Sequence, residues 1–401
     1  MLTLDKIYHA AFVLKDVARK TDLIEAPKLS KDCQLYLKTE NLQVTGSFKV
    51  RGAYYKISQL SKEESDKGVI ACSAGNHAQG VAFAATAAGV KSTIVMPRSA
   101  PIAKVSATQG YGAEVVLAGN IYDEAYAKAC EICEETGAEF IHPFDDEDVM
   151  AGQGTIALEI LRDLPGVDMI FVPAGGGGLI SGVAACAKQI NPRIQIIGVQ
   201  AEGAPAIANS FRTGERTPSD TVHTIADGIA VKTPGEKTFE YIKQYVDRVV
   251  TVSDDEIASA VLLLLERCKQ VVETSGAAPL AAVLNNKVDV KGKKVVCVLS
   301  GGNIDVSFIH KIVEKGLITR CRQLKFSVLM PDAPGALEHF SHIVAQQNAN
   351  IILFQHDRVQ TDLEIGEAII HVVCEVGGVD HAKRLIDTLT DDGYKVFTSQ
   401  I

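Results

Sequence analysis

The chain has 401 residues, which is too long for one small domain and suits a large core with an additional module. Hydrophobic residues make up 47% and charged residues 22%, a balance that excludes extensive disorder. The net charge of −9 argues against nucleic acid or an anionic membrane as the partner, since both attract basic surfaces. These values favour a protein that acts on a small molecule.

The first residues and the apolar runs of the sequence predict the cellular location of the protein. Residues 1–10 include charged side chains where a secretory signal would carry a basic stretch and an apolar run. The apolar runs are shorter than the roughly 20 residues that a membrane-spanning helix needs. We therefore expect a cytoplasmic protein without a membrane segment.

The nine cysteines are scattered along the chain. Cys72, Cys186 and Cys297 lie in apolar runs and are expected to be reduced core residues. Cys130 and Cys133 form a CxxC pair, but they lie in a helical pattern and no second pair follows. Zinc or redox chemistry is therefore the weaker interpretation of this pair.

Short β-rich runs alternate with helical patterns through the first three quarters of the chain. The runs that predict strands are 35–38, 69–72, 92–96, 114–117, 169–172, 195–199 and 294–299. This alternation is typical of parallel sheets covered by helices. It predicts an α/β domain over residues 1–318, in which a smaller lobe, about 45–150, is inserted in a larger one.

The last part of the chain has a different pattern. Gly316 and a polar run interrupt the alternation, which predicts a linker at 319–324. Residues 325–401 then read as strand, helix, strand, strand, helix and strand. This βαββαβ order predicts a separate domain of ferredoxin-like topology.

Four consecutive glycines, Gly175, Gly176, Gly177 and Gly178, follow an apolar strand and precede a helical pattern that is expected at 180–189. Backbone N–H groups in such a loop can converge on one phosphate, aided by the positive end of the helix dipole. The spacing does not fit a dinucleotide fingerprint, and a merely flexible loop is improbable at this junction. A monophosphate is the favoured ligand.

Lys49 follows Phe48 and precedes an apolar helical pattern expected at 53–60. Most lysines are solvated surface charges, but this position predicts partial burial. Burial would lower the pKa of the ammonium group, as a lysine that forms a Schiff base requires. Lys49 is therefore the candidate catalytic residue.

Two further segments end predicted strands. The residues Ser73, Ala74, Gly75, Asn76 and His77 precede a helical pattern at 78–88, so their N–H groups could bind a substrate carboxylate, although Asn76 could simply cap the helix. His77 is expected to be a packed or orienting residue. Ser300 begins a Ser-Gly-Gly-Asn turn, and its neutral hydroxyl could meet a ring nitrogen without protonating it.

Together these four motifs resemble the fold type II pyridoxal-phosphate enzymes, and among them the threonine and serine dehydratases. The resemblance extends from about residue 4 to residue 316. It implies that Lys49 forms the Schiff base with pyridoxal 5'-phosphate, and that the ring contacts are Phe48, Asn76 at the pyridine oxygen and Ser300 at the ring nitrogen. It also implies phosphate binding by Gly175, Gly176, Gly177, Gly178 and Leu179.

The resemblance implies a lyase that deaminates L-threonine to 2-oxobutanoate and ammonia by β-elimination, with L-serine as a side substrate. Ser73, Ala74, Gly75, Asn76 and His77 would close over the substrate carboxylate. Some relatives hold a cation with an acidic residue followed by a second acid. Glu202 fits the first place, but Ala206, Ile207 and Ala208 offer no second carboxylate, so no metal is expected.

The tail resembles an ACT domain, a module that binds small effectors at subunit contacts. The resemblance implies an allosteric enzyme of the catabolic type that forms homodimers or homotetramers. The candidate effector residues are Asp332, Gly335, Ala336, Leu337 and Asn350. His339 and His342 have helical spacing, but two histidines without further ligands do not predict a metal site.

Two alternatives stay open at this point. A serine racemase or serine dehydratase shares every motif above. A racemase differs from a dehydratase by an additional acid on the opposite face of the cofactor. A non-catalytic amino-acid sensor could keep the fold, although the presence of Lys49 argues against it. Cysteine synthase chemistry is less favoured, because the attached effector domain is typical of dehydratases.

Overall fold

The computed structural model describes residues 2–359 and 363–398, which divide into two compact units, Met1–Ile304 and Asp305–Ile401. Each unit has its own apolar core. The helix α13, Val306–Thr319, passes through Lys315 and Gly316, where the sequence predicts an interruption. Its packing groups it with the second unit, whereas the sequence places the end of the catalytic domain at residue 318.

The larger lobe of the first unit is built on a six-stranded sheet of order β1-β2-β10-β7-β8-β9. All pairs are parallel except β1 with β2. The strands, in sheet order, are β1 Leu23–Glu25, β2 Gln34–Lys38, β10 Lys294–Val298, β7 Met169–Pro173, β8 Gln195–Ala201 and β9 Arg248–Val252.

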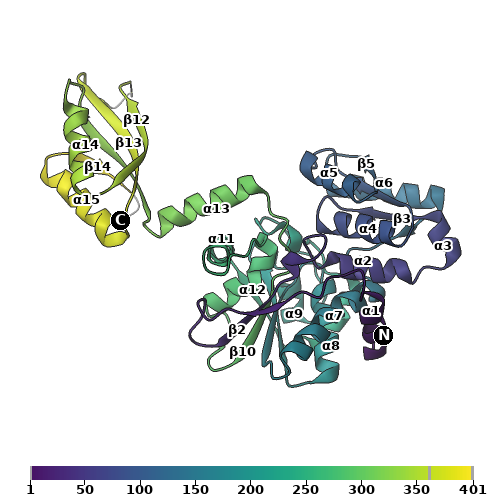
Figure 1. Cartoon of the computed structure of the whole chain (residues 1–401). Coiled ribbons are helices and arrows are strands. Elements are labelled where there is room, and N and C mark those ends of the chain that lie inside the picture. The colour runs from purple at the N-terminus through teal and green to yellow at the C-terminus, as the bar shows by residue number, and fades with distance from the viewer. Residues whose placement is uncertain (1, 360–362, 399–401) are drawn as a thin grey trace. The chain divides into compact units, whose positions relative to one another are not determined.

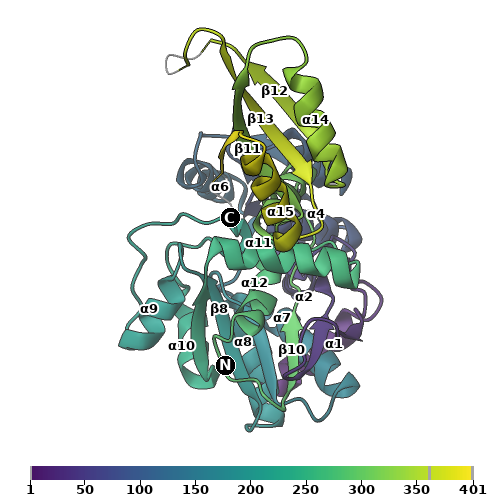
Figure 2. The same ribbon diagram turned by 90° about the vertical axis from the view of Figure 1, so that its left-hand side faces the viewer.

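Helices cover both faces of this sheet, with α8 packed on one face and α12 on the other (Figure 2). The central strand β7 is buried along its whole length, as its unbroken apolar sequence predicts. The helices of this lobe are α1 Leu4–Val13, α7 Glu147–Asp163, α8 Gly178–Ile190, α9 Ala206–Thr213, α10 Glu236–Tyr245, α11 Asp254–Leu263 and α12 Thr274–Leu284.

The smaller lobe contains a four-stranded parallel sheet of order β5-β4-β3-β6 (Figure 1). Its strands are β5 Glu114–Leu117, β4 Ser92–Met96, β3 Val69–Cys72 and β6 Glu139–Phe140. Its helices are α2 Lys49–Ser58, α3 Lys62–Lys67, α4 Asn76–Ala87, α5 Ile102–Gly110 and α6 Tyr122–Thr136. The predicted two-lobed α/β fold is confirmed.

Three predicted helices begin earlier than the sequence suggested. α2 starts at Lys49 instead of residue 53, α4 at Asn76 instead of 78, and α8 at Gly178 instead of 180. Apolar periodicity marks the buried face of a helix, and the first turn of each of these helices faces the candidate site, where polar residues and glycine break the pattern. The edge strands β1 and β9 were not predicted.

The second unit has the predicted βαββαβ order, with sheet order β12-β13-β11-β14. The helices α14 and α15 pack on the same face of the sheet (Figure 2). Its elements are β11 Gln323–Pro331, α14 Ala336–Gln346, β12 Asn350–Asp357, β13 Glu367–Glu375, α15 Val379–Asp391 and β14 Lys395–Phe397. β11 begins inside the predicted linker because Leu324 is buried in this core.

The cysteines that the sequence places in the core, Cys72, Cys186 and Cys297, are buried and free. Cys130 and Cys133 lie on α6, and neither forms a disulfide. Within residues 2–359 and 363–398, no helix is long and apolar enough to cross a membrane.

Candidate active site

The segment that carries Lys49 is tied to the carboxyl end of β10. The backbone N–H of Phe48 donates to the carbonyl oxygen of Ser300 at 3.1 Å. Ser47 and Gly301 form an isolated antiparallel bridge beside it. These bonds place two predicted site residues, Lys49 and Ser300, on adjoining stretches of backbone.

The Lys49 side chain is partly buried between the lobes, and its Nζ donates to the carbonyl oxygen of Pro143 at 2.8 Å. Nζ lies 5.3 Å from the centroid of the Phe48 ring. Burial lowers the pKa of Lys49 to about 8, although the Glu273 carboxylate opposes the shift. A larger fraction of the amine is therefore neutral near pH 7 than in an exposed lysine.

The glycine loop lies between β7 and α8 and is enclosed by other side chains. A Cβ atom on Gly176 would lie 2.3 Å from the Phe144 ring, and Gly177 has a φ of +103° that favours glycine. In the described part of the chain, the N–H groups of Gly175 and Gly176 have no backbone acceptor. Because α8 begins at Gly178, the loop also lies at the positive end of that helix.

The Ser73 segment forms the junction between β3 and α4. The Ser73 hydroxyl accepts a hydrogen bond from the N–H of Gly75 at 3.1 Å, and a Cβ atom on Gly75 would meet open space. Asn76 is the first residue of α4, and Ala74 precedes the helix. The free N–H groups of this first turn fit the binding of an anion such as a carboxylate.

His77 is buried, and its Nε2 lies 2.8 Å from the carbonyl oxygen of Ile141. Burial lowers the pKa of His77 to about 3, with a further contribution from the Lys49 charge. A neutral ring that donates to a carbonyl oxygen orients the backbone and does not act as a base. This geometry favours the packing role that the sequence suggested.

The structure places Glu273 in this site, a residue that sequence analysis missed. Its carboxylate accepts hydrogen bonds from Nδ2 of Asn76 at 2.8 and 2.9 Å. Burial raises the pKa of Glu273, and the Asn76 hydrogen bond opposes this shift. Glu273 immediately precedes α12, and sequence analysis singled out no motif around it.

Ser300 follows β10 and is 3% exposed. Its hydroxyl forms no hydrogen bond with the described residues, so it is available to a ligand in the site. Leu179 is buried in the first turn of α8. Two groups of predicted residues thus come together, one around Lys49, Asn76 and Ser300, and the other in the glycine loop.

The candidate effector residues of the second unit do not all come together in one copy. Asp332, Gly335, Ala336 and Leu337 follow the carboxyl end of β11, where Asp332 pairs with Arg358 at 3.1 Å. Asn350 lies at the opposite end of the sheet, opposite Glu375 in the register, and donates to its side chain at 3.0 Å. A single site that contains Asp332 and Asn350 therefore needs two copies of the unit.

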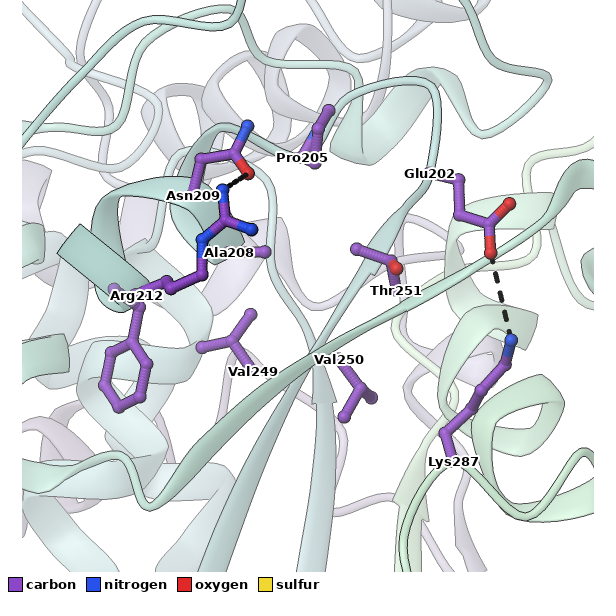
Figure 3. A pocket seen from close by; sticks show the side chains of 10 residues that line it. Glu202, Pro205, Ala208, Asn209, Arg212, Val249, Val250, Thr251 and Lys287 are labelled. Carbon is purple, nitrogen blue, oxygen red and sulfur yellow. Dashed lines mark hydrogen bonds and ion pairs between the residues drawn. The ribbon is translucent and has the colours of Figure 1, made fainter.

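A cavity of about 660 Å³ lies elsewhere in the first unit and contains none of the predicted ligand-binding residues (Figure 3). It borders α9 and the edge strand β9. Lys287 approaches Glu202 at 3.8 Å and Glu256 at 3.0 Å, so an ammonium group already balances the acid considered for a cation. Among the described residues, no group of three His, Cys, Asp or Glu side chains could hold a metal ion.

The two histidines of the second unit have partners of their own. His339 Nε2 lies 2.6 Å from Asp392, and the ring stacks on Tyr394. His342 Nε2 lies 2.8 Å from the Gln346 amide. Each histidine thus contacts a side chain of the same unit.

Comparison with known proteins identifies the family. Residues 14–301 match the family described as pyridoxal-phosphate dependent enzyme. The chain belongs to this family. It is 50% identical over 398 residues to L-threonine ammonia-lyase of Thermotoga maritima, a match that covers 99% of each chain. A catabolic L-threonine dehydratase of Staphylococcus aureus is 48% identical over 79% of this chain and 93% of its own.

Solved structures agree with the assignment to the pyridoxal-phosphate dependent enzymes. The processed form of threonine deaminase isoform 2 from Solanum lycopersicum has a TM-score of 0.74 and 41% identity, covering 78% of this chain and 94% of its own. Maize serine racemase has a TM-score of 0.74 and 36% identity, covering 78% and 97%. The predicted family, fold and cofactor are therefore confirmed.

The residues present fit pyridoxal phosphate, the cofactor of this family. The N–H groups of the glycine loop have no backbone acceptor among the described residues, which suits a phosphate. Lys49 offers an amine whose pKa is about 8, and Ser300 offers a hydroxyl that no other described group uses. The loop N–H groups match the phosphate of the cofactor, the Lys49 amine matches its aldehyde, and the Ser300 hydroxyl matches its ring nitrogen.

We expect Gly176→Ala to weaken cofactor binding by at least about tenfold, because the added methyl group would lie 2.3 Å from the Phe144 ring and displace the loop. Equilibrium titration of the apoenzyme with pyridoxal phosphate measures the effect. Gly110→Ala is the matched control, since a Cβ atom there meets open space. Equal affinities in the two variants would contradict the clamped geometry of the loop.

The lowered pKa of Lys49 predicts how cofactor loading depends on pH. The neutral amine is the nucleophile, so the rate of Schiff-base formation by the apoenzyme should rise with pH and level off above about 8. With an ordinary lysine, the rate of Schiff-base formation would keep rising with pH up to the lysine pKa of about 10.4. Stopped-flow absorption over this range provides the measurement, and a rate that still rises steeply above pH 9 would contradict it.

Proposed function

We propose that this chain deaminates L-threonine to 2-oxobutanoate and ammonia. The observation that carries the proposal is the 50% identity over 99% of both chains with L-threonine ammonia-lyase of Thermotoga maritima. Lys49, partly buried at the start of α2 with a pKa of about 8, supplies the nucleophile that this chemistry needs. Formation of 2-oxobutanoate from L-threonine by the purified protein is the test.

Each part of the candidate site has its own role in this reaction. Bound pyridoxal phosphate supplies an electron sink that weakens the bonds at the substrate Cα. Lys49 first tethers the cofactor and then, as a free amine, removes the Cα proton. The N–H groups at Asn76 and His77 would hold the substrate carboxylate, the glycine loop would hold the phosphate, and Asn76 and Ser300 would contact the ring.

The neutral hydroxyl of Ser300 supports elimination over transamination. A carboxylate at this position would keep the ring nitrogen protonated and stabilise a long-lived carbanion. The Ser300 hydroxyl would not force a proton onto the ring nitrogen, which would favour departure of the β-hydroxyl over reprotonation. Loss of water from the substrate followed by hydrolysis of the released enamine gives the 2-oxo acid and ammonia.

Serine racemisation is the second candidate, because maize serine racemase matches this chain with a TM-score of 0.74 and 36% identity. Chiral chromatography of L-serine incubations separates the two functions. Pyruvate without D-serine supports the dehydratase, whereas D-serine in excess of pyruvate would assign the racemase. A sensor without catalysis would produce neither compound.

For the second unit we propose an ACT-type regulatory role. Its βαββαβ order and single-face helices support the assignment. The separation of Asp332 from Asn350 across the sheet supports an effector site formed between two copies, with an amino acid or a nucleotide as ligand. An effector site shared by two copies would make the chain a homodimer or homotetramer, and we include a cytoplasmic location and the catabolic type in the proposal.

A further inference from the structure

The orientation of the Asn76 amide is fixed by a chain of hydrogen bonds that starts at the backbone. Nδ2 of Asn303 donates to the carbonyl oxygen of Thr45 at 2.9 Å and to Oδ1 of Asn76 at 2.8 Å. A carbonyl oxygen can only accept, so the Asn303 atom that faces it must be the nitrogen. Asn76 therefore presents its oxygen to Asn303 and its nitrogen to Glu273.

Glu273 receives that nitrogen with both carboxylate oxygens, at 2.8 and 2.9 Å. Glu273 stands at the N-cap of α12, and its side chain forms no capping hydrogen bond with that helix. The carboxylate is directed at Asn76 instead.

The surrounding backbone holds Glu273 in place. Its N–H donates to the carbonyl oxygen of Gly301 at 2.9 Å. A Cβ atom on Gly301 would lie 2.5 Å from Oε1 of Glu273, so the glycine leaves the space that the carboxylate occupies. The turn that carries Ser300 is therefore linked to Glu273 by a backbone hydrogen bond and by close packing.

We propose that Glu273 is a positioning residue that holds the Asn76 amide so that one N–H remains directed at the ring oxygen of the cofactor. The two N–H bonds of an amide diverge too widely for both to reach one carboxylate, so one hydrogen is left free. Asn303 prevents the amide from turning over. The inference rests on the proposed function, in which Asn76 contacts the cofactor.

The first test compares Glu273→Ala and Glu273→Gln in the holoenzyme. Glu273→Ala should change the visible circular dichroism of bound pyridoxal phosphate and lower kcat for L-threonine by about 10- to 100-fold, because the ring loses its fixed tilt. Glu273→Gln keeps an acceptor oxygen and should restore most of both signals. Glu240→Gln, an exposed acid on α10, is the matched control and should leave both unchanged.

A second variant keeps the proposal testable if Glu273→Ala fails to fold. Asn303 is exposed, and Asn303→Asp replaces its donor with an acceptor, which removes the restraint that keeps the Asn76 oxygen facing it. The same change in visible circular dichroism is expected. Unchanged spectra and kcat in Asn303→Asp and in the folded Glu273 variants would overturn the proposal.

The experiments distinguish a failure of the proposed function from a failure of the role assigned to Glu273. A wild-type protein that shows no visible band with pyridoxal phosphate, or that makes no 2-oxobutanoate, would overturn the proposed function. A wild-type protein that shows both, with variants identical to it, would overturn only the role of Glu273.

Discussion

Lys49→Ala is expected to lower the rate of L-threonine deamination by at least about 10³-fold. A general base alone contributes about 10²–10⁴-fold, and this residue also tethers the cofactor. The visible band of the bound cofactor should disappear as well, because the variant has no amine at position 49 to form the Schiff base. Steady-state 2-oxobutanoate production and absorption spectra measure the two effects.

Lys62→Ala is the matched control, because Lys62 is an exposed residue at the start of α3. Borohydride treatment of the wild-type holoenzyme should fix the cofactor to a peptide that contains Lys49. A fixed cofactor on another lysine, or full activity in Lys49→Ala, would contradict the assignment of the catalytic residue.

Arg51→Met is expected to destabilise the first unit by about 3–5 kcal/mol, since it removes the guanidinium that pairs with the buried Glu40 carboxylate. Arg51 is 1% exposed and pairs with Glu40 at 2.8 Å and with Glu159 at 2.7 Å. Burial alone would raise the pKa of Glu40, but the Arg51 guanidinium holds it below its ordinary value. Lys38 completes the cluster with a 2.5 Å contact to Glu159.

Urea unfolding of the apoenzyme, followed by far-UV circular dichroism, measures this loss as a lower transition midpoint. Arg162→Met serves as the control, because Arg162 lies on the surface of α7 at 3.7 Å from Asp163, and such pairs contribute about 0–1 kcal/mol. Acidification should also lower the free energy of unfolding of the wild type. Glu40 has a lowered pKa, so its stabilising contribution is present above its unfolded pKa and disappears as the pH falls through the folded one. Equal midpoints for the two variants would contradict the role of the cluster.

The sequence predicted those parts of the fold that depend on local patterns. The strands β3, β4 and β5 were predicted at their observed bounds, because continuous apolar runs between polar turns mark buried parallel strands. Lys49, Asn76, the glycine loop and Ser300 were found because each stands at a strand end or a helix start. The edge strands were not predicted for different reasons: β1 has only three residues, whereas the valine-rich sequence of β9 was overlooked.

Features that depend on contacts between distant segments could not be predicted. Glu273 joins the site through Asn76, which lies 197 positions away in the sequence. The buried cluster of Arg51 joins α2 to α7 across the two lobes, and each member alone resembles an ordinary surface charge. The crowding of Gly176 by Phe144 likewise depends on tertiary structure.

The most direct test of the proposed function is the reaction of the purified holoenzyme with L-threonine, followed by chromatographic identification of the products. We expect 2-oxobutanoate and ammonia in equal amounts, formed faster than pyruvate is formed from L-serine. A protein that binds pyridoxal phosphate through Lys49 but returns L-threonine unchanged would contradict the account.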